Sequence, residues 1–364
     1  GGGARAEQLE LAEDLVGWLN EAARFASAIP VARWLLQERS ATHAGQAAAP
    51  GGERALATLA VGHAALLLGS LLARAGKWGD AEPKFRQACA IFERELGAAH
   101  FQVARACRKL GVVYRRQSQY RDARAMFTRA IEIVSGCPVG VGEAEGVCFL
   151  ANVKASLGVL QTITKEYDAA ELTFEEVQRL TVEAHGPTHI EVAKVLSQRA
   201  NVLLKQHKHA EALADLQTSL QIKVEVCGPL HPECAYSYMA LARLHASVGH
   251  EAAALRCSHE ACQIRMETLG LEHPRTRETV WHHVGALRVA LLQAAGGEDM
   301  ARVKELFAAS KGNITVQKQM GFLLGRHHAN FDAEDEDCED EDEINKLISN
   351  GTMHELFLGL AREL

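Results

Sequence analysis

The sequence has few aromatic residues, no paired cysteine motif and no long apolar stretch. Phe, Trp and Tyr make up 5% of the 364 residues, whereas Ala and Leu are abundant, which favours helix-on-helix packing over sheets. The 9 cysteines include no CxxC pair, so we predict free thiols in a reducing compartment. No apolar stretch reaches the roughly 20 residues needed to cross a bilayer, so no membrane span is predicted.

Motifs for nucleotide binding or catalysis are also absent. The chain contains no G-x-x-x-x-G-K-[ST] and no H-E-x-x-H motif, and Gly140, Gly142 and Gly146 miss the G-x-G-x-x-G spacing by one residue. Its 17 histidines include adjacent pairs, which point in different directions on a helix and make poor metal ligands. We therefore predict no catalytic residue, no cofactor and no metal site. An enzyme or metal-binding protein is the third functional hypothesis, and it rests on the histidine excess alone.

Negative charge is concentrated in one late segment. The net charge is −7, and residues 332–343 contribute ten acids and no base, so the rest of the chain carries +3. Three interpretations of this acidic run stay open. It is a disordered, solvated spacer, it competes with partners by occupying a basic groove of the same chain, or it contacts a basic partner beside the helix that follows it.

A 42-residue period runs through much of the chain. Two residue types follow it in register, namely the glycines Gly186, Gly228 and Gly270 and the histidines His189, His231 and His273. The pair Leu68-Gly69 recurs as Leu110-Gly111 and, after a five-residue insertion, as Leu157-Gly158. A fixed period of this size indicates stacked supersecondary units that bury their apolar faces on one another.

Each unit combines a small residue in one helix with an alanine and an apolar side chain in the next. The pattern is clear in the second unit, which contains Leu110-Gly111, Tyr114, Ala123 and Phe127. It resembles the tetratricopeptide repeat, L-G-x-x-Y followed by A-x-x-x-F. The longer period and the Leu-Gly-x-x-His-Pro motif at 269–274 are similar to kinesin-light-chain repeats. The resemblance implies a right-handed superhelix of helical hairpins whose concave groove takes peptide segments of partners.

The repeat register predicts how the chain is divided. Residues 54–295 are predicted to form an all-α, right-handed α-solenoid of five to six repeats. Residues 1–53 would form a degenerate capping repeat of N-terminal helices, with an Ala/Gly/Pro linker at 41–53. Capping helices are expected in 296–331, and the acidic run, 332–343, is expected to be disordered. A capping-box pattern then starts an amphipathic helix within 344–364.

The same register predicts which side chains line the groove. The resemblance places four positions of each first helix on the concave face, and these make the second unit a basic stripe. Residues 101–131 contain eight Arg and Lys and one acid. The predicted groove residues are Arg105, Arg108, Arg115, Asn152, Lys194, Asn201, Tyr236, Arg243 and Trp281. Such guanidinium, carboxamide and aromatic groups suit an extended peptide that carries carboxylates.

One departure from the kinesin-light-chain pattern concerns cargo. Those repeats place an Asn pair at two neighbouring groove positions, where this chain has Arg108-Lys109 and other non-Asn pairs. The resemblance therefore implies the fold and not the cargo of that family.

The predicted function is a non-enzymatic adaptor or scaffold that grips an acidic, partly aromatic peptide of a partner protein. The alternative is a structural subunit of a large ciliary, cytoskeletal or organellar assembly, and a basic face that is merely solvated stays open as well. Nucleic acid is a disfavoured partner because the chain is acidic overall. We predict a cytoplasmic location, including cytoskeletal or ciliary association. An organelle stays open because the chain begins Gly-Gly-Gly without Met.

Overall fold

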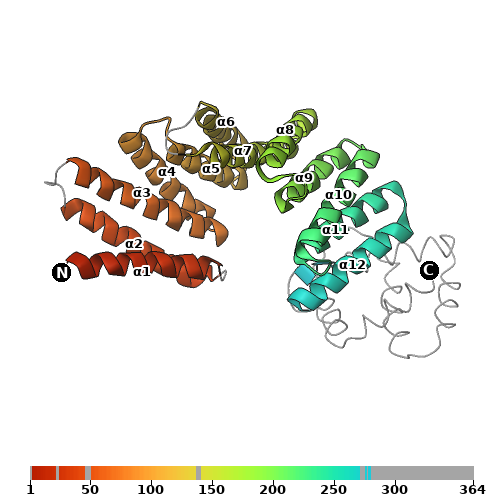
Figure 1. Cartoon of the computed structure of the whole chain (residues 1–364), viewed down its shortest axis with the longest axis horizontal. Helices are drawn as coiled ribbons and strands as arrows, with labels where there is room; N and C mark the ends of the chain where they lie inside the picture. Colours follow the sequence, from red (N-terminus) through yellow and green to blue (C-terminus); the bar gives the residue numbers. More distant parts are fainter. Residues whose placement is uncertain are drawn as a thin grey trace, which may run out of the picture. The chain divides into compact units, whose positions relative to one another are not determined.

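A computed structural model describes residues 2–21, 24–45, 51–136, 141–270, 275–276 and 278–279. Twelve α-helices lie within these ranges and are shown in Figure 1: α1 (Gly2–Glu21), α2 (Phe25–Gly45), α3 (Gly51–Arg74), α4 (Trp78–Leu96), α5 (Phe101–Arg116), α6 (Tyr120–Ser135), α7 (Glu143–Ile163), α8 (Tyr167–His185), α9 (Ile190–Lys205), α10 (His209–Cys227), α11 (Pro232–Val248) and α12 (Glu251–Leu269). No β-strand occurs among the described residues. The prediction of an all-α helical-repeat fold is confirmed over this part of the chain.

The helices pack as successive hairpins within two compact units, residues 1–187 and 188–364. In the first unit, α3 packs on α4, α5 on α6 and α7 on α8, and each hairpin also contacts the next. In the second unit, α9 packs on α10 and α11 on α12. The first helices of neighbouring hairpins also touch, as α3 with α5, α5 with α7 and α9 with α11. Each unit therefore has a row of first helices, which is where the repeat register places the predicted groove residues.

Close helix approach within three hairpins depends on a glycine that faces a phenylalanine ring. A Cβ atom added at Gly69 would lie 2.8 Å from the ring of Phe85, and at Gly111 only 2.6 Å from the ring of Phe127. The third hairpin repeats this contact with Gly158 and Phe174. Both distances are shorter than van der Waals contact, so any side chain at Gly69 or Gly111 would push the two helices apart. The small residue and the aromatic residue of the repeat pattern are thus two halves of one contact.

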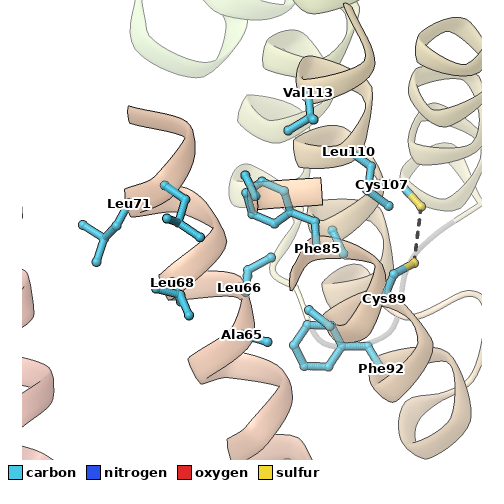
Figure 2. Packing of buried hydrophobic residues seen from close by; sticks show 14 of the residues in the cluster. Ala65, Leu66, Leu68, Leu71, Phe85, Cys89, Phe92, Cys107, Leu110 and Val113 are labelled. Atoms are coloured by element: carbon cyan, nitrogen blue, oxygen red, sulfur yellow. Dashed lines mark hydrogen bonds between the residues drawn. The ribbon is translucent and has the colours of Figure 1, made fainter. Parts of the chain in front are cut away.

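Figure 2 shows how the core of the first unit continues from one hairpin to the next. Ala65, Leu66, Leu68 and Leu71 of α3 lie beside Phe85 and Phe92 of α4, and Leu110 and Val113 of α5 follow on the other side. All of these side chains are buried. Burial of this size, at about 1.5–3 kcal/mol for each large apolar side chain, is the main favourable term that holds neighbouring hairpins together.

The recurrent histidines begin helices. The Nδ1 atom of His100 accepts a hydrogen bond from the backbone N–H of Gln102 at 3.1 Å. His189 and His231, spaced by the 42-residue period, make the same bond at 3.2 Å to the second residue of α9 and of α11. Helix N-termini leave backbone donors without partners, and an acceptor side chain at the N-cap satisfies one of them. His273 lies outside the described residues.

The tight turn inside each hairpin has a left-handed residue at an equivalent place. Gly76 and Gly249 have φ angles of 76° and 80°, whereas Ser118, Lys165 and His207 adopt 62°, 65° and 62° without being glycine. A left-handed conformation costs a residue with a Cβ about 1–2 kcal/mol. The turn residue therefore occupies a strained position in three hairpins of five, those with Ser118, Lys165 and His207.

Two predictions from the sequence need correction. The linker predicted at 41–53 is shorter, because α2 continues to Gly45 and α3 begins at Gly51. The prediction that no segment is long and apolar enough to cross a membrane is wrong for Arg54–Arg74 and Ala144–Ile163, which meet both criteria. These segments belong to α3 and α7, and 56% and 33% of their most apolar windows are buried inside the protein. Their apolar side chains pack between repeats, so length and composition alone are weak evidence for a membrane span.

Candidate partner-binding site

The α5 helix carries five cations on one side, and the last of them, Arg116, lies 5.6 Å from the ring centroid of Trp78. We call the side chains of Arg105, Arg108, Lys109 and Arg115 the α5 basic face. At 100° per residue they fall within one third of the helix circumference. The opposite side of the helix is apolar and buried, including Val103, Ala104, Cys107, Leu110 and Val113. The alternation of apolar and basic residues in α5 thus places the apolar side chains toward the core and the basic side chains on the other face of the helix.

Aromatic side chains support this face from α7. The guanidinium of Arg108 lies 5.6 Å from the ring centroid of Phe149. The Phe149 ring in turn meets the ring of Phe101 edge-on, with 4.9 Å between centroids. A cation held over an aromatic face gains about 0.5–2 kcal/mol, depending on how far it is desolvated. Arg108 is therefore positioned between α5 and α7 by a ring that also offers an apolar surface to a ligand.

The positive charges of Arg108 and Lys109 are poorly solvated, whereas the side chain of Arg105 is exposed. Burial, and then the charge of Arg105, lowers the pKa of Arg108. Burial, followed by repulsion from Arg108, Arg105 and Arg74, lowers the pKa of Lys109 to about 8. On α3, burial and the charges of Arg105 and Arg39 lower the pKa of His63. Each shift has the same sign, which means that the free protein disfavours the positive charge that it gathers here.

No carboxylate among the described residues compensates these charges. None of the four side chains has an acidic oxygen within ion-pair distance, and the polar bond of Arg105 is a long one of 3.4 Å to Gln102 Oε1. The Nε atoms of Arg108 and Arg115 are buried and lack a hydrogen-bond partner. Cations elsewhere in the first unit do form ion pairs, namely Arg39–Glu13, Arg86–Glu82, Arg124–Glu166, Arg129–Glu93, Lys154–Glu176 and Arg179–Glu183. The α5 basic face is thus a local excess of positive charge that an external anion would relieve.

The one other predicted groove residue of the first unit, Asn152, lies on α7, the first helix of the next hairpin. Asn152 is exposed, but its amide nitrogen donates to the carbonyl of Cys148 at 3.0 Å in its own helix. Sequence reasoning missed Lys109, Phe149 and His63 as site residues. Lys109 directly follows Arg108 and stands where the kinesin-light-chain pattern has Asn, so the sequence pattern could have identified it as a groove residue. The sequence carried no signal for the contact of Phe149 with Arg108.

In the second unit, the predicted residues have partners of their own or stand apart. Lys194 Nζ forms an ion pair with Glu191 at 2.7 Å, and Asn201 and Arg243 are exposed. The Tyr236 ring lies between two guanidinium groups, 4.9 Å from Arg265 and 5.5 Å from Arg275. Trp281 lies outside the described residues. The charge of Lys194 and the ring of Tyr236 are therefore engaged within the unit.

Metal binding has no support among the residues that the structure describes. No three His, Cys, Asp or Glu side chains are gathered there in a way that could hold a metal ion. The histidine excess instead has an architectural use at His100, His189 and His231, which begin helices.

Two family descriptions match parts of the chain. The tetratricopeptide repeat family matches residues 61–135 and 191–267. The RPN1 N-terminal domain family matches residues 268–364, most of which lie outside the described residues.

Solved structures of the same fold are similar along much of the chain. A signal-transduction ATPase with a tetratricopeptide repeat sensor from Pyrococcus horikoshii aligns with a TM-score of 0.54 and 14% identity over 96% of this chain and 54% of that one. The apo form of RapI aligns with a TM-score of 0.51 and 16% identity over 77% of this chain and 98% of that one. The structure of nearly identical TPR-like repeats of the kinesin-light-chain type from Podosopora anserina aligns with a TM-score of 0.49 and 16% identity over 57% of this chain and 95% of that one. Residues 61–135 and 191–267 of the chain are therefore identified as tetratricopeptide repeats.

Proposed function

We propose that this protein is a non-enzymatic adaptor that binds an acidic peptide segment of a partner protein on the α5 basic face. Tetratricopeptide repeats serve in protein–protein interaction and are generally not enzymes, which supports the general role. The specific proposal rests on one observation, the four clustered cations of α5 that have no carboxylate among the described residues.

Desolvated charges explain why an acidic ligand would bind here. The free protein already carries the cost of partly burying Arg108 and Lys109, so an arriving carboxylate gains a charge-assisted hydrogen bond without that cost. Phe149 adds an apolar surface beside Arg108. An extended segment with several Asp or Glu side chains and one aromatic or aliphatic side chain therefore fits the chemistry of the face.

Charge removal tests the proposal. The Arg105→Gln/Lys109→Gln variant should bind a fluorescein-labelled Glu/Asp-rich peptide containing one Phe at least tenfold more weakly, because each lost ionic contact removes on the order of 1 kcal/mol or more. Fluorescence anisotropy at two salt concentrations measures the affinity, and the wild-type affinity should fall as salt rises. The matched control is Arg121→Gln, an exposed cation of α6 in the same unit. Equal binding by the double variant and the wild type would sink the proposal, and so would an equal loss in Arg121→Gln.

The acidic run of residues 332–343 requires a separate comparison. A variant with its Asp and Glu residues replaced by Asn and Gln shows whether this run competes for the same ligand. Tighter, salt-sensitive peptide binding by that variant would support competition, and unchanged affinity would exclude it.

A second candidate function, a structural subunit of a larger assembly, is supported by a different surface. On α1, Leu11, Leu15 and Trp18 are 67%, 45% and 59% exposed and lie at helical spacing on one face. Terminal repeats of solenoids usually need a polar outer face for solubility. Leu11→Glu/Trp18→Glu should prevent stoichiometric co-purification with an assembly and leave binding of the acidic peptide unchanged. If Leu11→Glu/Trp18→Glu leaves stoichiometric co-purification with the assembly unchanged, the structural role is wrong.

A further inference from the structure

Two buried thiols meet between consecutive repeats of the first unit. Cys89 belongs to α4, the second helix of one hairpin, and Cys107 belongs to α5, the first helix of the next hairpin. Their Sγ atoms are 4.0 Å apart, as the dashed line in Figure 2 shows. Cys107 is fully buried and Cys89 is 7% exposed. Both thiols are free.

An acid–base pair lies beside the two sulfurs. The thiol of Cys89 donates to Glu93 Oε1 at 3.4 Å, and the same oxygen is 2.6 Å from Nη2 of Arg129 on α6. The contact with Cys89 and the charge of Arg129 lower the pKa of Cys107, while the contact with Cys107 and burial raise the pKa of Cys89. The two sulfurs are thus made unequal, with Cys107 the readier thiolate and Cys89 the thiol that has a carboxylate to receive its proton.

We propose that Cys89 and Cys107 form an oxidation site, at which hydrogen peroxide converts the two thiols to a disulfide that joins α4 to α5. The Cys107 thiolate attacks one peroxide oxygen, the O–O bond breaks, and the products are a sulfenic acid and hydroxide, which takes up a proton to become water. Cys89 then gives its proton to Glu93 and its sulfur attacks the Cys107 sulfur. The S–O bond breaks and the leaving hydroxide takes the proton from Glu93. Two thiols and one peroxide thus yield one disulfide and two waters.

The geometry allows this reaction with small movements. A disulfide bond is about 2.05 Å long, so the sulfurs must approach each other by roughly 2 Å, which side-chain rotation on two adjacent helices can supply. The side chains of Glu93 and Arg129 are 33% and 38% exposed, so the site borders solvent on that side, and the oxidant would reach the buried Cys107 by displacing them. Cys262 is the matched contrast, because it is equally buried, burial raises its pKa to about 12, and no hydrogen bond to a second thiol is found for it among the described residues.

Peptide mapping of the full chain tests the proposal. The protein is treated with hydrogen peroxide, blocked with N-ethylmaleimide in denaturant, and digested with trypsin without reduction. We expect the peptide 87–94 linked to the peptide 106–108, lighter by two hydrogens than the sum of both and separated by dithiothreitol. Cys148, which is less buried, reports that the oxidant acted, and Cys262 should be recovered as the maleimide adduct. Recovery of both Cys89 and Cys107 as maleimide adducts while Cys148 is oxidised would overturn the proposal, as would links spread over other cysteines.

Three variants assign the roles. In Cys89→Ser, the sulfenic acid of Cys107 cannot be resolved and should be trapped by dimedone, whereas Cys107→Ser should leave Cys89 free of dimedone. In Cys89→Ser/Arg129→Gln, dimedone labelling should slow several-fold because the guanidinium no longer stabilises the thiolate. Labelling of Cys89 in place of Cys107 would reverse the assignment and refute it. The wild-type mapping stands without the variants if one of them fails to fold.

Discussion

Binding of an acidic peptide to the α5 basic face should weaken as the pH rises through the pKa of Lys109. Burial and then the charges of Arg108, Arg105 and Arg74 lower this pKa to about 8 in the free protein. A bound carboxylate favours the ammonium form, so in the complex the pKa returns toward its ordinary value of about 10. The complex then holds a proton that the free protein has lost between about pH 8 and pH 10, and affinity falls across that interval.

The expected size of this effect follows from the two pKa values. With about 8 in the free protein and about 10 in the complex, linkage makes the affinity at pH 9 roughly tenfold weaker than at pH 7. Burial and the charges of Arg105 and Arg39 lower the pKa of His63 from its ordinary value, so His63 titrates below this range. Anisotropy measurements with the labelled acidic peptide at constant ionic strength give the profile.

The matched variant is Lys109→Arg, because a guanidinium keeps its charge throughout the interval. Its affinity should be nearly constant from pH 7 to pH 9. A flat profile for the wild type would refute the reasoning, and an equal fall in Lys109→Arg would assign the effect to another group.

The same lowered pKa has a consequence for stability. The group is charged in both the folded and the unfolded chain below about pH 8, and there its burial costs stability; this cost disappears as the pH rises from 8 toward the unfolded value of 10.5. Lys109→Met should therefore raise the free energy of unfolding at pH 7 by roughly 1–3 kcal/mol, a range that allows for solvent screening. The gain should vanish above about pH 10 in urea titrations.

Three further predictions concern the repeat architecture and are read from urea unfolding. Gly111→Ala places a Cβ 2.6 Å from the Phe127 ring and should lower the free energy of unfolding by about 1–3 kcal/mol, whereas Gly79→Ala, with nothing within 4 Å, should not destabilise. Equal effects would contradict the close contact. Gly76→Ala should cost about 1 kcal/mol through its φ of 76° alone, and no change would remove the strain argument. His100→Ala should lose about 1 kcal/mol of capping while His100→Asn retains most of it, so equal losses would refute the cap.

The hairpins could be predicted from the sequence because their physics is local. Gly111 and Phe127 lie 16 residues apart and meet within one hairpin, so the repeat period alone places their contact. The basic stripe of α5 was visible for the same reason, since helical spacing puts its cations on one side. Lys194 shows the limit of that argument, because Glu191, three residues earlier, forms an ion pair with it.

Contacts between hairpins were not predictable from the sequence alone. The low pKa of Lys109 depends partly on Arg74 of α3, and the site of Arg108 depends on Phe149 of α7. Neither pair has a spacing that a motif would reveal. The same holds for Cys89 and Cys107, whose sulfurs meet across two repeats. The spacing of residues in a single sequence indicates which face of its helix a residue occupies. How well its charge is solvated depends on the packing of neighbouring helices.

The central position of α5 within the first unit bears on how fast a ligand can bind. This helix contacts α3 and α4 on one side and α6 and α7 on the other, whereas α1 stands at the end of the unit. In repeat proteins the terminal elements open first, and interior elements exchange their amide hydrogens most slowly. A binding face on such an interior helix is already ordered before the partner arrives, so the peptide alone loses conformational freedom. Association should then be limited by diffusion and charge steering, without a preceding rearrangement of the protein.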